Sequence, residues 1–194
     1  MKIWTKALFK LVSTYLAYAD RYRLLYYKYL YGEQLVLGEH IAFGEGSSIV
    51  IHPNSEKARL ELGSGTIFRS GCGLRLVNDG HLIIGVNNFF NNGCSISCLG
   101  SIRIGENNLF GEAVRFYDHN HRFRDLNQDI RNQGFSVGNI VVGNNCWIGS
   151  NCIILNNVTI GDNVVIGANS LVNKSIPANT IVKSNPIVDL IDRA

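Results

Sequence analysis

Hydrophobic residues recur every six positions through most of this chain. Near the C-terminus an aliphatic residue stands at six consecutive such positions, and glycine directly follows four of them. Upstream the same spacing returns in groups of three, separated by longer gaps. The repeated anchor positions are Leu37, Phe43, Ile49, Leu62, Phe68, Leu74, Ile84, Phe90, Ile96, Ile104, Phe110, Phe116, Val142, Ile148, Ile154, Ile160, Ile166 and Val172. Repeats that cannot bury an apolar face alone must stack, so the period indicates a solenoid.

Six residues suit a short strand followed by a turn. The anchor side chain should point inward together with the residue two positions before it, and the residue directly before the anchor should point outward. Polar corner residues such as Gly143-Asn144-Asn145 follow the anchors and suit a backbone with positive φ. Three such units make one coil. The pattern therefore predicts an all-β solenoid of about six coils around a narrow column of aliphatic and phenylalanine layers.

Two longer gaps interrupt the period. The gap between Ile49 and Leu62 leaves a small loop at His52-Pro53-Asn54, and the gap between Phe116 and Val142 predicts one long extruded loop over residues 117–141. Loops held by a rigid scaffold often carry function. The predicted division of the chain is an N-terminal helical appendage at 1–33, the solenoid at 34–186 and a short C-terminal tail at 187–194.

The N-terminal segment follows a helical period instead. Apolar residues alternate in steps of four and three, and no Pro or Gly occurs before Gly32, which predicts a helix over residues 2–31. This aromatic stripe consists of Trp4, Leu8, Leu11, Tyr15, Tyr18, Tyr22, Leu25 and Tyr29. Two interpretations stay open: the stripe packs on the solenoid or on a neighbouring subunit, or the helix lies on the inner membrane surface.

Charge is distributed unevenly along the chain. Residues 1–33 hold six Lys/Arg and two Asp/Glu, whereas the remaining residues hold twelve and thirteen. The appendage is too charged to span a membrane, and the solenoid has no basic stripe of the kind that binds nucleic acid.

The cysteines bear on localisation. Of five cysteines, Cys72, Cys94, Cys146 and Cys152 occupy inward positions and are expected to be reduced thiols. No secretory signal is recognisable. We therefore expect a cytoplasmic protein, with a peripheral position at the inner membrane as the alternative.

Two polar segments stand out against the repeat. The long loop opens with Tyr117-Asp118-His119-Asn120-His121, and Cys146-Trp147-Ile148-Gly149-Ser150-Asn151 follows it. With the six-residue period, these segments resemble the hexapeptide-repeat acyltransferases, in particular the sugar O-acetyltransferases that include capsule- and O-antigen-modifying enzymes. The resemblance covers roughly residues 34–186. It implies a left-handed parallel β-helix, a homotrimer with sites between subunits, acetyl-CoA as co-substrate, a sugar or glycan acceptor, and no metal.

The resemblance also implies catalytic roles for two histidines. His121 lies seventeen residues after Ile104, which matches the position of the general base in the galactoside type. A neutral imidazole can take the proton of a hydroxyl as that hydroxyl attacks a thioester. His119 is expected to orient His121 or to contact the acceptor. Tyr117 and Asp118 are expected at the acceptor, where Asp118 could also hold the tautomer of a neighbouring histidine.

Further residues match the family's binding positions. Asn92 corresponds to an asparagine that contacts the acetyl or acceptor group, and the outward ring of Trp147 is assigned to the acceptor or CoA groove. The backbone N–H of Ser150 corresponds to the donor for the developing oxyanion. The expected CoA-binding residues are Trp147, Gly149, Ser150, Ala168, Asn173, Lys174 and Lys183. The chain departs from the family at Asn185-Pro186-Ile187-Val188, which lacks the usual basic residue, so Lys183 or Arg193 is the expected substitute.

The function predicted from these residues is acetyl-CoA-dependent O-acetylation of a sugar hydroxyl on a bacterial surface polysaccharide or its precursor. A sugar-nucleotide N-acetyltransferase is the alternative on the same fold. A zinc hydratase of the γ-carbonic-anhydrase type would need His81, His119 and His121 to gather around one ion. A scaffold without activity would not need His121 and Trp147.

Overall fold

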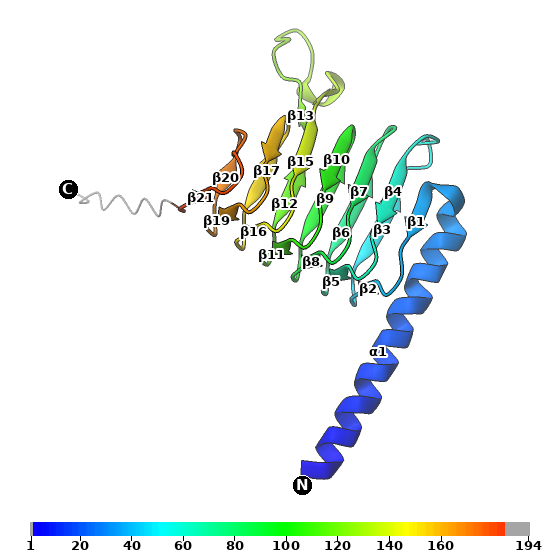
Figure 1. The fold of residues 1–194 in the computed structure, drawn as a ribbon. Coiled ribbons are helices and arrows are strands. Elements are labelled where there is room, and N and C mark those ends of the chain that lie inside the picture. Colours follow the sequence, from blue (N-terminus) through cyan, green and yellow to red (C-terminus); the bar gives the residue numbers. More distant parts are fainter. Residues whose placement is uncertain (1, 185–194) are drawn as a thin grey trace, which may run out of the picture.

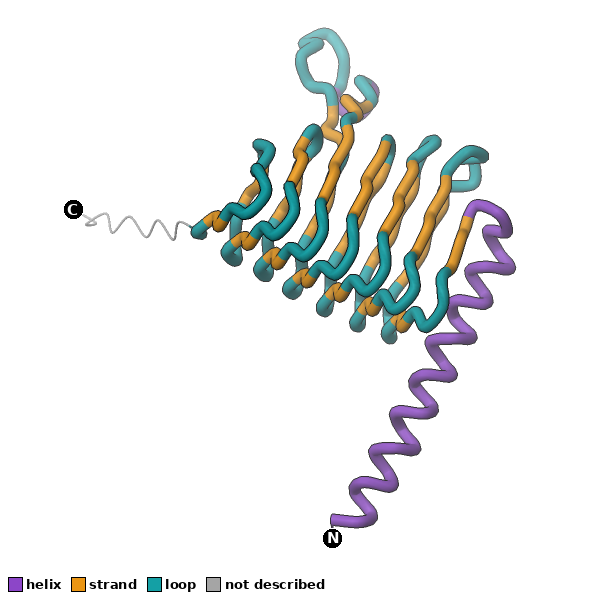
Figure 2. The backbone as a smooth tube through the Cα atoms, viewed as in Figure 1, coloured by secondary structure: helices purple, strands orange, loops and turns teal. Residues whose placement is uncertain are grey.

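The protein is a parallel solenoid preceded by one long helix (Figures 1 and 2). The computed structural model describes residues 2–184, and within the helix it describes the side chains of Thr14 and residues 18–31. The predicted all-β solenoid of about six coils is confirmed, and the arrangement is consistent with a left-handed β-helix. The side chains of Trp4, Leu8, Leu11 and Tyr15, the tail at 187–194, the Asn185–Val188 segment and Arg193 lie outside the described residues.

Three parallel sheets form the faces of the solenoid, and each of six coils contributes one strand to each sheet, while a further strand at the C-terminal end extends the second sheet alone. The first sheet contains β1 (Leu35–Leu37), β4 (Arg59–Leu62), β7 (His81–Ile84), β10 (Ser101–Ile104), β15 (Asn139–Val142) and β18 (Val158–Ile160). The second sheet contains β2 (Ala42–Phe43), β5 (Ile67–Phe68), β8 (Phe89–Phe90), β11 (Leu109–Phe110), β16 (Trp147–Ile148), β19 (Val165–Ile166) and β21 (Ile181–Val182). The third sheet contains β3 (Ser48–Ile51), β6 (Gly73–Leu76), β9 (Ser95–Cys98), β12 (Arg115–Tyr117), β17 (Ile153–Leu155) and β20 (Leu171–Val172).

The anchor residues fill the column as the period predicts. All of them are buried except Leu37 in the first coil, which is partly buried. Phenylalanine rings stack along the second sheet, with 4.7 Å between the ring centres of Phe68 and Phe90 and 4.4 Å between those of Phe90 and Phe110. Aromatic rings at these separations attract one another beyond simple burial.

The cysteines also face the column. All five are free and buried, including Cys98, which unlike the other four does not stand two positions before an anchor. Burial raises the pKa of the Cys146 and Cys152 thiols. Burial also raises the pKa of Cys98, and the neighbouring Asp118 carboxylate adds to that effect. These thiols therefore act as small apolar side chains of the core.

Asparagines turn the chain at the corners. Asn145, Asn163 and Asn179 have φ angles of 54°, 56° and 59°, in the left-handed region that asparagine tolerates better than most residues. Their side chains also join successive coils, because Asn145 donates to Asn163 at 2.8 Å and Asn163 donates to Asn179 at 3.0 Å. The repeated asparagines thus allow the turn at each corner and also link the corners of successive coils.

Helix α1 (Lys2–Tyr31) covers the open end of the column, and the short 3-10 helix η1 (Gly32–Gln34) joins it to β1. Leu24 is buried against the first coil, and the Tyr27 ring meets the Phe43 ring edge-on at 6.1 Å. Arg23 donates from Nη1 to the carbonyl oxygens of Phe43 and Gly44. These contacts bury the apolar layer of the first coil, which would otherwise face water.

The face of α1 that packs on the solenoid is not the aromatic stripe, contrary to one of the two sequence interpretations. Tyr18, Tyr22, Leu25 and Tyr29 are 58%, 70%, 54% and 89% exposed, so the described part of the aromatic stripe does not pack on this chain's own solenoid. Residues three or four apart share one helix face, and the docking face is the one that carries Leu24. The stripe points the other way because Arg23 reaches carbonyl groups of the first coil and holds the opposite face against the body.

Candidate active site

A β-hairpin projects from the solenoid where the long loop was predicted (Figure 1). β13 (His119–His121) pairs antiparallel with β14 (Phe135–Val137), and the connecting segment contains the 3-10 helix η2 (Ile130–Asn132). β12 ends at Tyr117 and β15 begins at Asn139. The hairpin is tied to the next coil, because Asn120 donates from Nδ2 to the Asn156 side chain at 2.9 Å. Both histidines therefore stand on a short, paired strand rather than on a free loop.

Asp118 fastens the base of this hairpin to the coil before it. Its side chain is fully buried, and its oxygens accept the backbone N–H of Leu99 at 2.9 Å and the backbone N–H of Gly100 at 2.7 Å. Its backbone oxygen also accepts the N–H of Gly138 at 2.7 Å. A buried carboxylate needs such donors. In place of the expected acceptor contact, the Asp118 side chain meets backbone amides and one histidine.

The two histidines have different surroundings. Nδ1 of His119 lies 3.0 Å from Oδ1 of Asp118, and the His119 side chain is only 15% exposed. His121 is exposed to solvent. The Phe135 ring contacts both imidazoles, at 5.3 Å from the His119 ring and 4.4 Å from the His121 ring. Tyr117 is half-buried beside them, its ring edge-on to His119 at 6.4 Å. The sequence interpretation had given Phe135 no role, because its contacts depend on the hairpin register.

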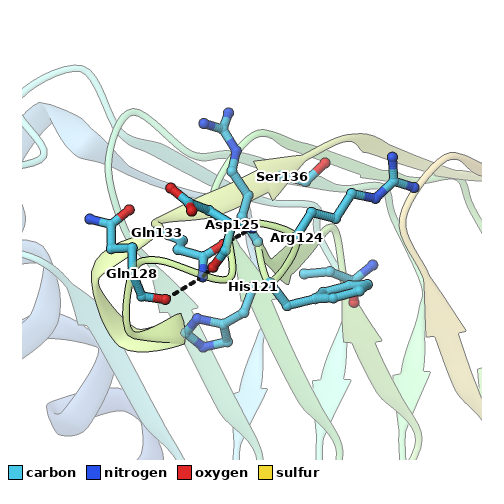
Figure 3. A pocket seen from close by; sticks show the side chains of 9 residues that line it. His121, Arg124, Asp125, Gln128, Gln133 and Ser136 are labelled. Atoms are coloured by element: carbon cyan, nitrogen blue, oxygen red, sulfur yellow. Dashed lines mark hydrogen bonds between the residues drawn. The ribbon is translucent and has the colours of Figure 1, made fainter.

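A hollow of about 650 Å³ opens beside His121 (Figure 3). It is formed by the hairpin alone, and Arg124, Gln128 and Ser136 contribute to its walls. Gln133 braces the turn, because its Nε2 donates to the backbone oxygens of Asp125 and Gln128, each at 2.8 Å. The exposed imidazole thus borders a polar space that is open to solvent.

Two further predicted site residues lie on the same edge of the solenoid as the hairpin. We define the hairpin edge as the corners that lead from the third sheet back to the first. Asn173 and Lys174 follow β20 at this edge, and the strand register places β20 two coils beyond β12. At the usual spacing of paired strands this separation is about 10 Å. A long ligand along the hairpin edge could reach the hairpin and the last coil together.

Other predicted residues lie on a different edge. We define the Asn92 edge as the corners that lead from the second sheet to the third. Asn92 donates from Nδ2 to Glu112 at 3.2 Å, and the Glu112 N–H bonds Oγ of Ser150 at 3.1 Å. Ala168 stacks on Gly149 so closely that a Cβ at Gly149 would lie 2.5 Å from the Ala168 nitrogen. Lys183 follows β21 at this edge and is exposed.

Glu112 is a polar neighbour that the sequence interpretation missed. It occupies the corner position one coil after Asn92, since Phe90 and Phe110 pair in register and each stands two residues earlier. That register is readable from the six-residue period and would have identified Glu112.

One chain does not bring the two edges together. The Ala113 N–H bonds the Asn92 backbone oxygen, and strand β12 then separates Ala113 from His119. At the rise of an extended strand, the distance between these two residues is about 20 Å. The histidines and Asn92 of the same chain therefore cannot contact one acetyl group.

Trp147 lies on the outer face of the second sheet and is 57% exposed, as its position before the anchor Ile148 predicts. It stands between Leu109 and Val165 in the strand register. The outward residues of this sheet form an apolar ladder: Ala42, Ile67, Phe89, Leu109, Trp147, Val165 and Ile181. Apolar ladders of this kind suit either an apolar ligand segment or another copy of the chain.

No group of three or more potential metal ligands occurs among residues 2–184. His81 belongs to β7, where its Nε2 lies 3.1 Å from the backbone oxygen of Lys57. The histidine set required for a zinc hydratase is thus not gathered within the described part of one chain.

Comparisons with known proteins support the repeat fold. A family model described as bacterial transferase hexapeptide (six repeats) matches residues 139–174, from β15 to the corner after β20. No curated protein matches the sequence. A maltose O-acetyltransferase from Clostridium difficile 630 is similar in structure, with 28% identity, a TM-score of 0.55, and coverage of 82% of this chain and 70% of that one.

Two further solved structures extend the likeness. A hexapeptide-repeat-containing acetyltransferase from Vibrio cholerae O1 biovar eltor, complexed with acetyl-CoA, has 26% identity and a TM-score of 0.51, with 76% and 68% of the two chains covered. A mutant of AntD, an N-acyltransferase from Bacillus cereus in complex with dTDP and coenzyme A, has 19% identity and a TM-score of 0.64, with 78% and 80% covered. At that identity, AntD supports the fold alone. The maltose O-acetyltransferase and the Vibrio cholerae acetyltransferase support an acyltransferase. The Vibrio cholerae structure contains acetyl-CoA and the AntD structure contains coenzyme A.

Proposed function

We propose that this protein is an acetyl-CoA-dependent O-acetyltransferase that modifies a sugar hydroxyl on a bacterial surface polysaccharide or its precursor. The observation that carries the proposal is the pair of imidazoles on a braced hairpin, with Asp118 buried behind them and a solvent-open hollow beside them. The likeness to a maltose O-acetyltransferase adds support for a sugar hydroxyl as acceptor.

His121 is the proposed general base. Its ring is exposed and can meet a hydroxyl that enters from solvent, whereas His119 has one ring nitrogen beside Asp118. The neutral imidazole takes the hydroxyl proton while the oxygen attacks the thioester carbonyl. A C–O bond forms, the C–S bond breaks, and the imidazolium returns the proton to the departing CoA sulfur. His119 positions the acceptor beside His121, and Phe135 limits the movement of both rings.

A complete site requires a second copy of the chain. The Asn92 edge holds the expected donors to the acetyl group, and the hairpin edge holds the base about 20 Å away along β12. We therefore propose a homotrimer in which the hairpin of one copy faces the Asn92 edge of its neighbour. The apolar ladder around Trp147 is available both for contact between copies and for the pantetheine arm.

The direct test is acetyl transfer from acetyl-CoA to a panel of bacterial glycans and simple glycosides, followed by mass spectrometry. Amino-sugar nucleotides belong in the same panel, because acetylation of an amine instead of a hydroxyl would favour the N-acetyltransferase alternative.

His121→Ala should lower the turnover rate by ~10²–10⁴-fold, since general-base catalysis contributes about that factor. The thermal unfolding midpoint should stay unchanged, because the His121 side chain is exposed. His119→Ala serves as the matched variant on the same strand. A fully active His121→Ala beside an inactive His119→Ala would transfer the role of base to His119.

A further inference from the structure

The outward face of α1 is an exposed aromatic surface that the proposed transferase reaction does not use. This outward face consists of Tyr18, Tyr22, Leu25, Tyr26, Tyr29 and Leu30, all more than half exposed. Its tyrosines lie away from the docking face that carries Leu24, and Leu25 lies at the border, where it also lines a hollow beside the first coil. The N-terminal part of the helix extends beyond the edge of the coils (Figure 1). Contiguous apolar surface of this kind normally marks an interaction site.

We propose that the outward face of α1 binds the surface of a bilayer that contains anionic lipids. Helix α1 has 30 residues, which corresponds to a length of about 45 Å. Among the described residues no helix is long and apolar enough to cross a membrane. The helix therefore lies along the interface, where the apolar body of a tyrosine can enter the acyl boundary while its hydroxyl stays among the headgroups.

The charges on the helix favour an anionic surface. Asp20 is the sole acidic residue of α1, and it is paired with Arg23 at 3.2 Å on the side that meets the solenoid. Arg21 is exposed beside the outward face. The first 33 residues hold six basic and two acidic side chains, including Lys2, Lys6 and Lys10. Each Lys or Arg close to an anionic bilayer adds to the attraction at the surface.

The composition of the face argues against a second copy of the helix as its occupant. Tyrosine dominates the described positions of the stripe, whereas helices that pair in coiled coils prefer leucine, isoleucine or valine at the contact positions. Two copies of a basic segment would also repel each other. The surface of an anionic bilayer accommodates both the tyrosines of the outward face and the basic residues of the helix.

The experiment is co-sedimentation of the full chain with vesicles. Vesicles of phosphatidylcholine are compared with vesicles that also contain phosphatidylglycerol, at low and high salt. We expect binding to the phosphatidylglycerol vesicles, with a decrease in high salt. The triple variant Tyr22→Ser/Leu25→Ser/Tyr29→Ser should weaken that binding by at least roughly 10-fold, because partitioning follows the buried apolar area.

The matched control is Val50→Ser/Val141→Ser, which removes two exposed apolar side chains of the solenoid that lie outside the apolar ladder and should leave vesicle binding unchanged. Equal binding of wild type and triple variant would overturn the proposal, as would the absence of binding to both vesicle types. A triple variant that dissociates into smaller oligomers would assign the face to a subunit contact instead. Acetyl transfer to a soluble glycoside should be equal in all variants, because none of the substituted residues belongs to the proposed active site. Vesicle binding is measured without the transferase reaction, so a failed transferase assay does not affect this test.

Discussion

At the scale of single residues, Asp118 links the fold to the candidate chemistry. Its carboxylate contacts the Leu99 and Gly100 amides, which precede it by almost one coil, and its next neighbour along the chain is His119. One buried side chain therefore sets where the hairpin leaves the solenoid and how the first imidazole is held.

Asp118→Asn should lower the free energy of unfolding by about 1–3 kcal/mol, because the new amide NH₂ cannot accept a backbone N–H and leaves a buried donor unpaired. Urea denaturation followed by circular dichroism measures this change. Asp125→Asn on the exposed part of the hairpin is the control and should stay within about 0.5 kcal/mol of wild type. Equal stability of both variants would mean that the amide bonds of Asp118 contribute little.

At the scale of elements, the strands of the second sheet separate inward from outward side chains within two residues. In β8, Phe89 faces outward and is partly exposed, and Phe90 is fully buried in the stack of rings. The same residue type thus serves two different purposes at adjacent positions.

Phe90→Ala should destabilise the protein by about 3–5 kcal/mol, since it leaves a cavity between the Phe68 and Phe110 rings. Phe89→Ala should cost clearly less than that, because its ring is not in the column. Chemical denaturation of the two variants provides the comparison. Similar losses in both would contradict the assignment of faces in β8.

At the scale of the whole molecule, the separation of the two edges decides how a site can be assembled. The rigid prism holds the Asn92 edge and the hairpin edge apart by the width of the third sheet. Closed rings of identical subunits present one edge of each copy to the other edge of the next.

Shared sites predict complementation between two inactive variants. His121→Ala and Asn92→Ala should each have low activity alone, and co-expressed mixed trimers should regain about one third of wild-type activity, because one of three clefts is then intact. Differently tagged chains and tandem purification isolate the mixed species. Mixed trimers that stay inactive would mean that both residues act within the same chain.

Local sequence alone determined the repeat, the inward and outward positions and the existence of the long helix, because these follow from backbone periodicity and side-chain size over a few residues. It also located His119 and His121 at the break in the repeat. Three features emerged only with the tertiary structure: the docking face of α1, the buried contacts of Asp118, and the distance between the two edges. Each depends on groups that are remote along the chain and become neighbours only when coils stack, so no local pattern encodes them.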